Sequence, residues 1–253
     1  MSEQQILDIR CGDTHVTGCS EPEGYVACEF VACLVSGASG VISGAKPASL
    51  FNYIPRSRRW DHTLHSGVTT HIESYDPRSL RKAEREAIRA CTLGLRRFGV
   101  ELVVLFRRES KMVLLAYKTD RLSAIVQDRE RAAFLAEHGY DTSSTDAVIR
   151  ELRRRMAAHY GDQGKATAFP HEIGLLLGYP LDDVRSFIAG EGRETCIGPW
   201  KAYGDRETEQ ARFRFIKECS RRCGDRFRSG ETLGELLALP VTRFSTATGG
   251  VLW

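Results

Sequence analysis

The sequence lacks the short motifs that identify the most common enzyme classes. It has no Walker loop, no dinucleotide-binding glycine fingerprint, no His-Glu-x-x-His zinc motif and no Gly-x-Ser-x-Gly nucleophile elbow. A large charge of one sign is also absent, because 36 Lys and Arg against 33 Asp and Glu leave a formal net charge of +3. The missing motifs exclude the enzyme classes that such motifs define, although not enzymes in general. The small net charge does not imply a polyanionic partner.

Long apolar stretches are missing as well. A bilayer-spanning helix needs about 20 apolar residues, and the longest candidate, 30–42, is interrupted by Ser and Gly. The first five residues are polar and acidic, which does not fit a secretory signal peptide. We therefore expect a cytoplasmic protein without membrane contact. In that reducing compartment the eight cysteines are expected to be thiols, metal ligands or redox groups rather than disulfides.

What the sequence does contain is a series of helical and strand-forming segments. Residues 78–98 carry apolar side chains at three- and four-residue steps, which predicts a long helix with one buried face. Segments 100–106 and 112–117 are rich in β-forming residues, and the polar link between them suits a hairpin. Their continuous apolarity predicts strands that are covered on both faces. A further strand is expected at 46–53 and a short buried helix at 25–35.

Together these segments predict an α+β fold. We expect a small mixed sheet with a central hairpin, packed against six or more helices, and a C-terminal half that is mostly helical. Residues 200–203 are expected to be extended and to extend this sheet. We expect an irregular leader at 1–23, a single α+β domain at 24–239 with an inserted loop at 54–77, and a loosely held tail at 240–253.

The densest group of chemically distinctive residues lies between 169 and 205. Pro170 suits the first turn of a helix, which would place His171 and Glu172 at the positive end of the helix dipole, as an acid–base pair or an anion site. Alternatively, both satisfy free amide groups of that turn. Lys46, beside several glycines, is either an anion-binding residue or an ordinary surface lysine. We predict a ligand pocket of aromatic walls and a few polar groups, lined by Lys46, His171, Glu172, Tyr179, Cys196, Trp200, Lys201 and Tyr203.

The sequence contains four short distinctive motifs: Lys-Pro-Ala at 46–48, Phe-Pro-His-Glu-Ile-Gly at 169–174, Leu-Gly-Tyr-Pro at 177–180 and Trp-Lys-x-Tyr-Gly-Asp at 200–205. These motifs resemble those of a bacterial domain-of-unknown-function family that is common in anaerobic Gram-positive bacteria. The resemblance covers residues 43–53 and 84–227, and it includes a cysteine shortly before the Trp-Lys pair, where Cys196 stands. It implies no activity. Our first hypothesis is small-molecule or cofactor handling linked to anaerobic redox metabolism, with the cofactor unknown.

A nucleic-acid-binding regulator is the first alternative. The helix pair expected at 170–189 is similar to a helix-turn-helix, but its second helix opens with Asp182 and Asp183, which would repel phosphates. The basic helices expected at 78–97 and 212–228 could contact nucleic acid, yet solvated helix faces explain them equally well. Nucleic acid is therefore the less favoured partner.

A thiol or metal protein that uses Cys196 with Cys219 and Cys223 is the second alternative. Two cysteines four residues apart on a helix lie side by side and could share a metal. However, this pair continues an apolar line that runs from Ala211 to Phe227, and free cysteine packs as a small hydrophobic residue. Core packing is the simpler explanation of the pair.

Overall fold

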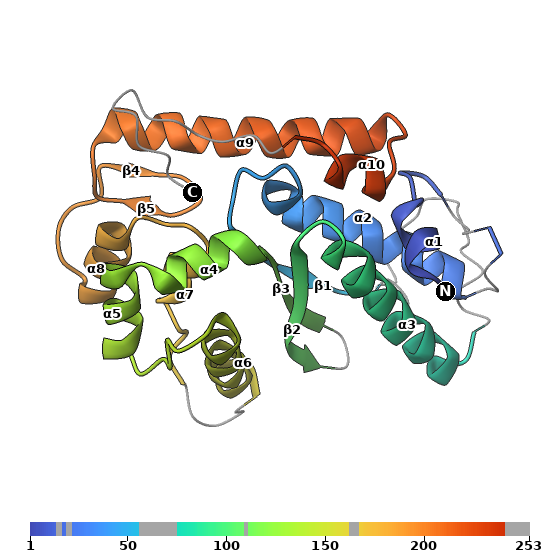
Figure 1. Ribbon diagram of the computed structural model, residues 1–253, viewed down its shortest axis with the longest axis horizontal. Coiled ribbons are helices and arrows are strands. Elements are labelled where there is room, and N and C mark those ends of the chain that lie inside the picture. Colours follow the sequence, from blue (N-terminus) through green and yellow to red (C-terminus); the bar gives the residue numbers. More distant parts are fainter. Residues whose placement is uncertain (14–16, 19–21, 56–74, 109–110, 162–166, 241–253) are drawn as a thin grey trace, which may run out of the picture.

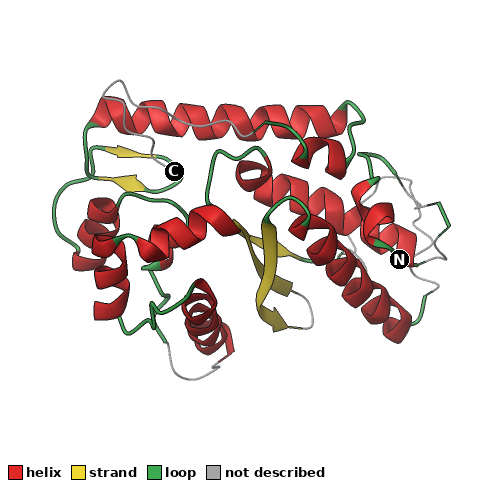
Figure 2. Cartoon of the chain, in the orientation of Figure 1, coloured by secondary structure: helices red, strands yellow, loops and turns green. Residues whose placement is uncertain are grey.

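The structure is a computed structural model that describes residues 1–13, 17–18, 22–55, 75–108, 111–161 and 167–240. Within these residues, ten helices and five strands are present (Figures 1 and 2). The helices are α1 (Glu3–Leu7), α2 (Glu23–Ile42), α3 (Pro77–Arg96), α4 (Thr119–Gln127), α5 (Arg129–Glu137), α6 (Thr145–Gly161), α7 (Ile173–Leu176), α8 (Leu181–Ala189), α9 (Arg206–Arg228) and α10 (Leu233–Leu237). The α+β class and a mostly helical C-terminal half are thus confirmed.

The main sheet contains β1 (Ala48–Tyr53), β2 (Val100–Arg108) and β3 (Lys111–Lys118) in the order β1-β3-β2. The predicted hairpin is present as β2–β3. Both pairs in this sheet are antiparallel, so the expectation of a mixed sheet is wrong. The physical reason is that β3 lies between β1 and β2 and separates the two strands that run in the same direction.

Side chains of β3 alternate between two hydrophobic clusters on opposite faces of the sheet. Leu114 belongs to a cluster with side chains of α2 and α3, whereas Leu115 belongs to a cluster with side chains of α4, α6 and α7. Both leucines are fully buried. The prediction of a strand covered on both faces is therefore confirmed for β3.

Helix α2 is longer than the 25–35 segment that we expected. Gly37 and Gly40 do not end it, although Ala38 between them has a non-helical backbone (φ −115°, ψ 15°) that kinks the helix. A Cβ atom at Gly37 would lie 2.6 Å from the Phe51 side chain, and one at Gly40 would lie 3.0 Å from Lys46. These glycines therefore permit α2 to approach β1 closely. Among the described helices, α2 alone is long and apolar enough to cross a bilayer, although most of it is buried inside the protein, as in a core helix.

The first residues of the chain are more ordered than the predicted irregular leader. Ser2 and Gln5 form a capping box at the start of α1, and Ile6 and Leu7 are buried in the cluster that contains α2 and α3. The predicted domain limits at 24 and 239 remain predictions. Most of the expected inserted loop at 54–77 and nearly all of the tail at 240–253 lie outside the described residues.

Helix α9 extends along most of the length of the molecule (Figure 1). It contacts α2 and α10 near one end and β4 (Cys196–Ile197) near the other. β4 pairs with β5 (Lys201–Ala202) in a separate antiparallel sheet. The expectation that residues 200–203 extend the main sheet is therefore wrong, because this hairpin packs on α8 and α9 instead.

Candidate ligand-binding cavity

A cavity of about 360 Å³ lies between α7, α8 and the β4–β5 hairpin. This volume lies within the range of small-molecule sites in proteins, about 300–1,000 Å³. Five ring-bearing side chains line it, together with two charged side chains and several aliphatic ones. The rings are those of Phe169, His171, Tyr179, Phe187 and Trp200, and the charged residues are Asp183 and Lys201.

Two glycines and a proline shape the backbone beside this cavity. Gly178 has a φ of 86°, a conformation that glycine adopts without steric cost, and it turns the chain after α7. Pro180 then precedes the first residue of α8. At Gly174, a Cβ atom would lie 2.8 Å from the Tyr179 ring. The glycines of the two central motifs are therefore needed for the turn and for the close packing of Tyr179.

Asp183 fastens the β4–β5 hairpin to α8. Its carboxylate accepts a hydrogen bond of 2.7 Å from the indole Nε1 of Trp200 and another of 2.7 Å from the backbone N–H of Tyr203. The side chain is buried. Because each carboxylate oxygen already accepts a hydrogen bond, Asp183 positions the Trp200 wall rather than presenting a vacant acceptor to a ligand.

The wall formed by Tyr179 and Trp200 is part of a longer row of packed side chains. The two rings stack with their centroids 4.5 Å apart and an interplanar angle of 23°. The Phe213 ring of α9 packs edge-on against Trp200 at 4.6 Å. Lys46 Nζ lies 5.6 Å from the centroid of Tyr179, which is within the range of a cation–π interaction. Residues from four separate parts of the chain thus support one wall.

Lys46 contacts this wall but does not itself line the cavity. Among the described residues it has no carboxylate partner, and desolvation lowers its pKa to about 8. By surface exposure Lys46 is half-buried, but a desolvated ammonium group without a counter-ion is costly, and the Tyr179 ring compensates only partly. The interpretation of Lys46 as an ordinary surface lysine does not fit this environment.

The structure brings together four of the eight predicted pocket residues. His171, Tyr179, Trp200 and Lys201 line the same cavity. His171 is exposed at its edge, between the rings of Phe169 and Phe187 at 5.3 and 4.9 Å. α7 starts at Ile173 with Glu172 as its N-cap and is a single turn without a side-chain cap hydrogen bond, so the anion or acid–base site at this helix start stays a prediction.

Glu172, Cys196 and Tyr203 do not line the cavity. Glu172 is buried, and it accepts hydrogen bonds from the Tyr140 hydroxyl at 3.0 Å and from Arg155 at 2.7 Å. Cys196 is half-buried beside a small cluster that contains Trp200. Tyr203 contributes its backbone N–H to Asp183. We therefore assign supporting rather than lining positions to these three residues.

Sequence reasoning did not select several cavity residues, notably Leu50, Phe169, Asp183 and Phe187. Asp183 could have been found from the sequence, because an acidic residue inside a partly apolar helix needs a hydrogen-bond donor nearby. Phe187 is 40% exposed, and nothing in its local sequence distinguishes it from Ile188.

The cysteine pair and the helix pair receive little support as functional sites. Cys219 and Cys223 are buried, and burial raises the pKa of Cys223 to about 11, which disfavours the thiolate that binds metals. In the described part of the chain, no group of three or more His, Cys, Asp or Glu side chains could hold a metal ion. Asp182 is exposed at the start of α8, where it would repel phosphate.

Comparison with protein families gives one match. The model of a family described as "Protein of unknown function (DUF3793)" matches residues 34–237, from within α2 to the last residue of α10. No curated protein and no solved structure matches the chain. The matched region includes every residue that lines the cavity.

Proposed function

The chain belongs to the family described as "Protein of unknown function (DUF3793)"; because this description assigns no activity, we propose from the cavity that the protein binds a small organic anion with a flat apolar part. The observation that carries this proposal is the convergence of five rings on one cavity of about 360 Å³. These rings come from the segment before α7, the α7–α8 turn, α8 and the β4–β5 hairpin.

The rings supply the apolar part of the binding energy. Flat side chains such as Trp200 and Phe187 bury large areas and hold a planar ligand by stacking or edge contacts. Tyr179 and Trp200 are already packed by Phe213, so this wall is formed before a ligand enters. A preformed wall lowers the entropic cost of binding.

Two lysines favour a negative charge on the ligand. Lys201 lines the cavity, is exposed and forms no ion pair within the described residues. Lys46 lies beside Tyr179 and has no carboxylate partner among the described residues. The one carboxylate in the lining, Asp183, is occupied by two donors. A ligand carboxylate or phosphate therefore meets positive charge at the wall.

Thermal shift measurements with a panel of aromatic carboxylates, aromatic phosphates and their neutral analogues test the proposal. We expect anionic ring compounds to raise the unfolding temperature, and Phe187→Ala to remove the effect. Ile188→Ala is the matched control, since Ile188 is 38% exposed against 40% for Phe187 but does not line the cavity. Equal binding by wild type and Phe187→Ala would rule out this cavity.

A narrower form of the proposal places the protein in the cytoplasm of an anaerobic bacterium, with a role in redox metabolism. It is supported by the resemblance of the four motifs. Mass spectrometry of small molecules that co-purify under anaerobic conditions tests it. A redox-active ring compound would support the narrower form, and a redox-inert ligand would contradict it.

A further inference from the structure

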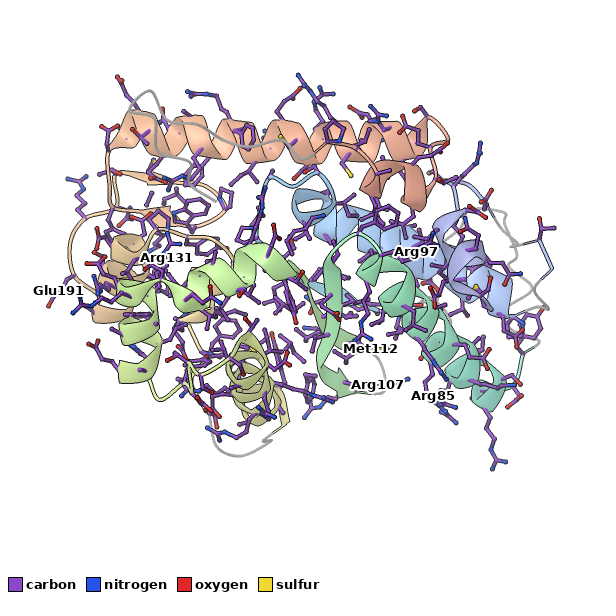
Figure 3. The ribbon with its side chains drawn as sticks, in the orientation of Figure 1. Arg85, Arg97, Arg107, Met112, Arg131 and Glu191 are labelled. Carbon is purple, nitrogen blue, oxygen red and sulfur yellow. The ribbon has the colours of Figure 1, made fainter. Side chains whose placement is uncertain are left out.

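We propose that the exposed face of α3 binds the phosphodiester backbone of a nucleic acid. Six cationic residues of this helix fall on one side at 3.6 residues per turn, and all are exposed: Arg78, Arg81, Lys82, Arg85, Arg89 and Arg96. Arg85 projects from α3 away from the body of the protein (Figure 3). This face is distinct from the cavity, which is built from α7, α8 and the β4–β5 hairpin.

Four of these six cations, Arg78 and three that follow one another along the helix, form no ion pair with any described residue. Arg81, Arg85 and Arg89 form a straight line at four-residue spacing, and none has an ion-pair partner among the described residues. By contrast, Lys82 pairs with Glu86 at 3.9 Å and Arg96 with Glu101 at 2.9 Å. Like charges four residues apart destabilise a helix. The line therefore costs stability and is relieved by an external anion.

Helix α9 shows the opposite arrangement in the same chain. Its C-terminal arginines, 221, 222, 226 and 228, all form ion pairs with Glu218, Asp225 or Glu231. Three other cations of α9, Arg206, Arg214 and Lys217, are exposed and form no ion pair with the described residues, but they do not follow one another at four-residue steps. The arginine line on α3 (Arg81, Arg85 and Arg89) therefore differs from the basic face of α9 in its lack of ion pairs and in its regular four-residue spacing.

The chemistry of this face favours nucleic acid over a membrane or a single small anion. Guanidinium groups bind phosphate in a bidentate manner, and a duplex offers about one charge per 1.7 Å of its axis. Leu80, Ala87 and Leu95 are buried in the core, so α3 has no free apolar face to insert into a bilayer. It contains no aromatic residue that could stack on bases. The contacts would therefore be sequence-independent.

The net charge of +3 is compatible with this inference, because it averages over the chain and hides the local line. Asp182 and Asp183 argue against nucleic-acid binding by the 170–189 helix pair, and both lie on α8. They do not bear on α3.

Fluorescence anisotropy with labelled duplexes of arbitrary sequence, one DNA and one RNA, tests the proposal over a salt series. We expect wild-type affinity to fall as salt rises, with a log–log slope near −3 from about three phosphate contacts. The triple variant Arg81→Gln/Arg85→Gln/Arg89→Gln should lose at least tenfold in affinity at low salt and most of that slope. The control Arg206→Gln/Arg214→Gln/Lys217→Gln removes the same charge from exposed positions of α9 and should stay within twofold.

Stronger binding of one duplex would identify the nucleic acid and would support the proposal. An equal loss in both triple variants would overturn it, since net charge alone would then explain binding. Absence of duplex binding at low salt, or binding to phosphatidylserine vesicles in its place, would also overturn it. Circular dichroism confirms folding, and the single variant Arg85→Glu provides a second test if the triple variant unfolds.

Discussion

The indole Nε1 of Trp200 donates a hydrogen bond of 2.7 Å to Asp183, whose other carboxylate oxygen accepts the backbone N–H of Tyr203 at the same distance. These contacts join residues 17 and 20 positions apart. Asp183 is 3% exposed, so water does not replace either bond. The position of one wall of the cavity relative to α8 therefore depends on this carboxylate.

Asp183→Ala is expected to lower the free energy of unfolding by about 2–3 kcal/mol, because a buried donor that loses its partner costs about 1–3 kcal/mol. Urea unfolding measures the change. Asp182→Ala is the matched control, since that side chain is 93% exposed, and it should change stability only by a few tenths of a kcal/mol. Similar losses in the two variants would contradict the anchoring position of Asp183.

Arg155→Ala should be far more destabilising than Arg154→Ala. Arg155 is 24% exposed and binds Glu172, Glu151 and the backbone carbonyl of His138. Arg154 is 69% exposed, and among the described residues it pairs only with Glu151. Removing Arg155 leaves the buried Glu172 carboxylate without its cation, which costs about 3 kcal/mol. Exposed pairs contribute up to about 1 kcal/mol. Chemical denaturation of both variants distinguishes these values.

A third variant, Glu172→Gln, tests whether Glu172 is structural. If Glu172 supports the turn before α7 rather than the ligand, Glu172→Gln should reduce stability while leaving the affinity of the folded protein for an anionic ring compound within about twofold. A large loss of affinity without loss of stability would instead indicate that Glu172 contacts the ligand.

Gly198→Ala is expected to destabilise the β4–β5 hairpin. A Cβ atom at this position would lie 2.3 Å from the Phe213 ring, so the ring that supports Trp200 must move. Overpacking of this kind costs about 1–3 kcal/mol. Gly161→Ala is the control, because a Cβ atom there meets nothing within 4 Å. Thermal unfolding should separate the two, and adding Phe213→Ala to Gly198→Ala should restore part of the loss.

Local patterns predicted the elements but not their partners. The spacing of apolar residues along 78–98 was sufficient for α3, and the continuous apolarity of 112–117 was sufficient for a strand covered on both faces. The end of α2 could not be predicted in this way. Gly37 reads locally as a helix breaker, and only the 2.6 Å distance from its would-be Cβ to Phe51 shows why a glycine is there.

The candidate site shows the same limit. His171 and Glu172 are neighbours, and the local sequence predicts the same kind of site for both. His171 lies at the cavity edge, whereas Glu172 binds Arg155, which lies 17 residues earlier in the chain. Such a choice depends on a long-range partner that no local pattern reveals. The aromatic residues Tyr179 and Trp200 were more predictable, because large aromatic side chains bury much apolar area in cores and binding sites.

Pulsed alkylation followed by mass spectrometry should find Cys223 protected in the native protein. Burial raises its pKa to about 11, so only a very small fraction is thiolate near neutral pH, and thiolate is the reactive form. Cys11 is exposed and should react first. Fast labelling of Cys223 before unfolding would contradict its assignment to the core and would revive the thiol hypothesis.

Lys46→Met should change how stability depends on pH above neutrality. Desolvation lowers the pKa of Lys46 in the folded protein to about 8, from 10.5, so between these values the unfolded chain binds more protons than the folded chain. The contribution of Lys46 to stability therefore rises with pH over this window and is constant well below it. Urea unfolding of wild type and variant from pH 6.5 to 10.5 measures the difference. Lys201→Met removes the same charge from an exposed position, and an identical profile in both variants would contradict the desolvation of Lys46.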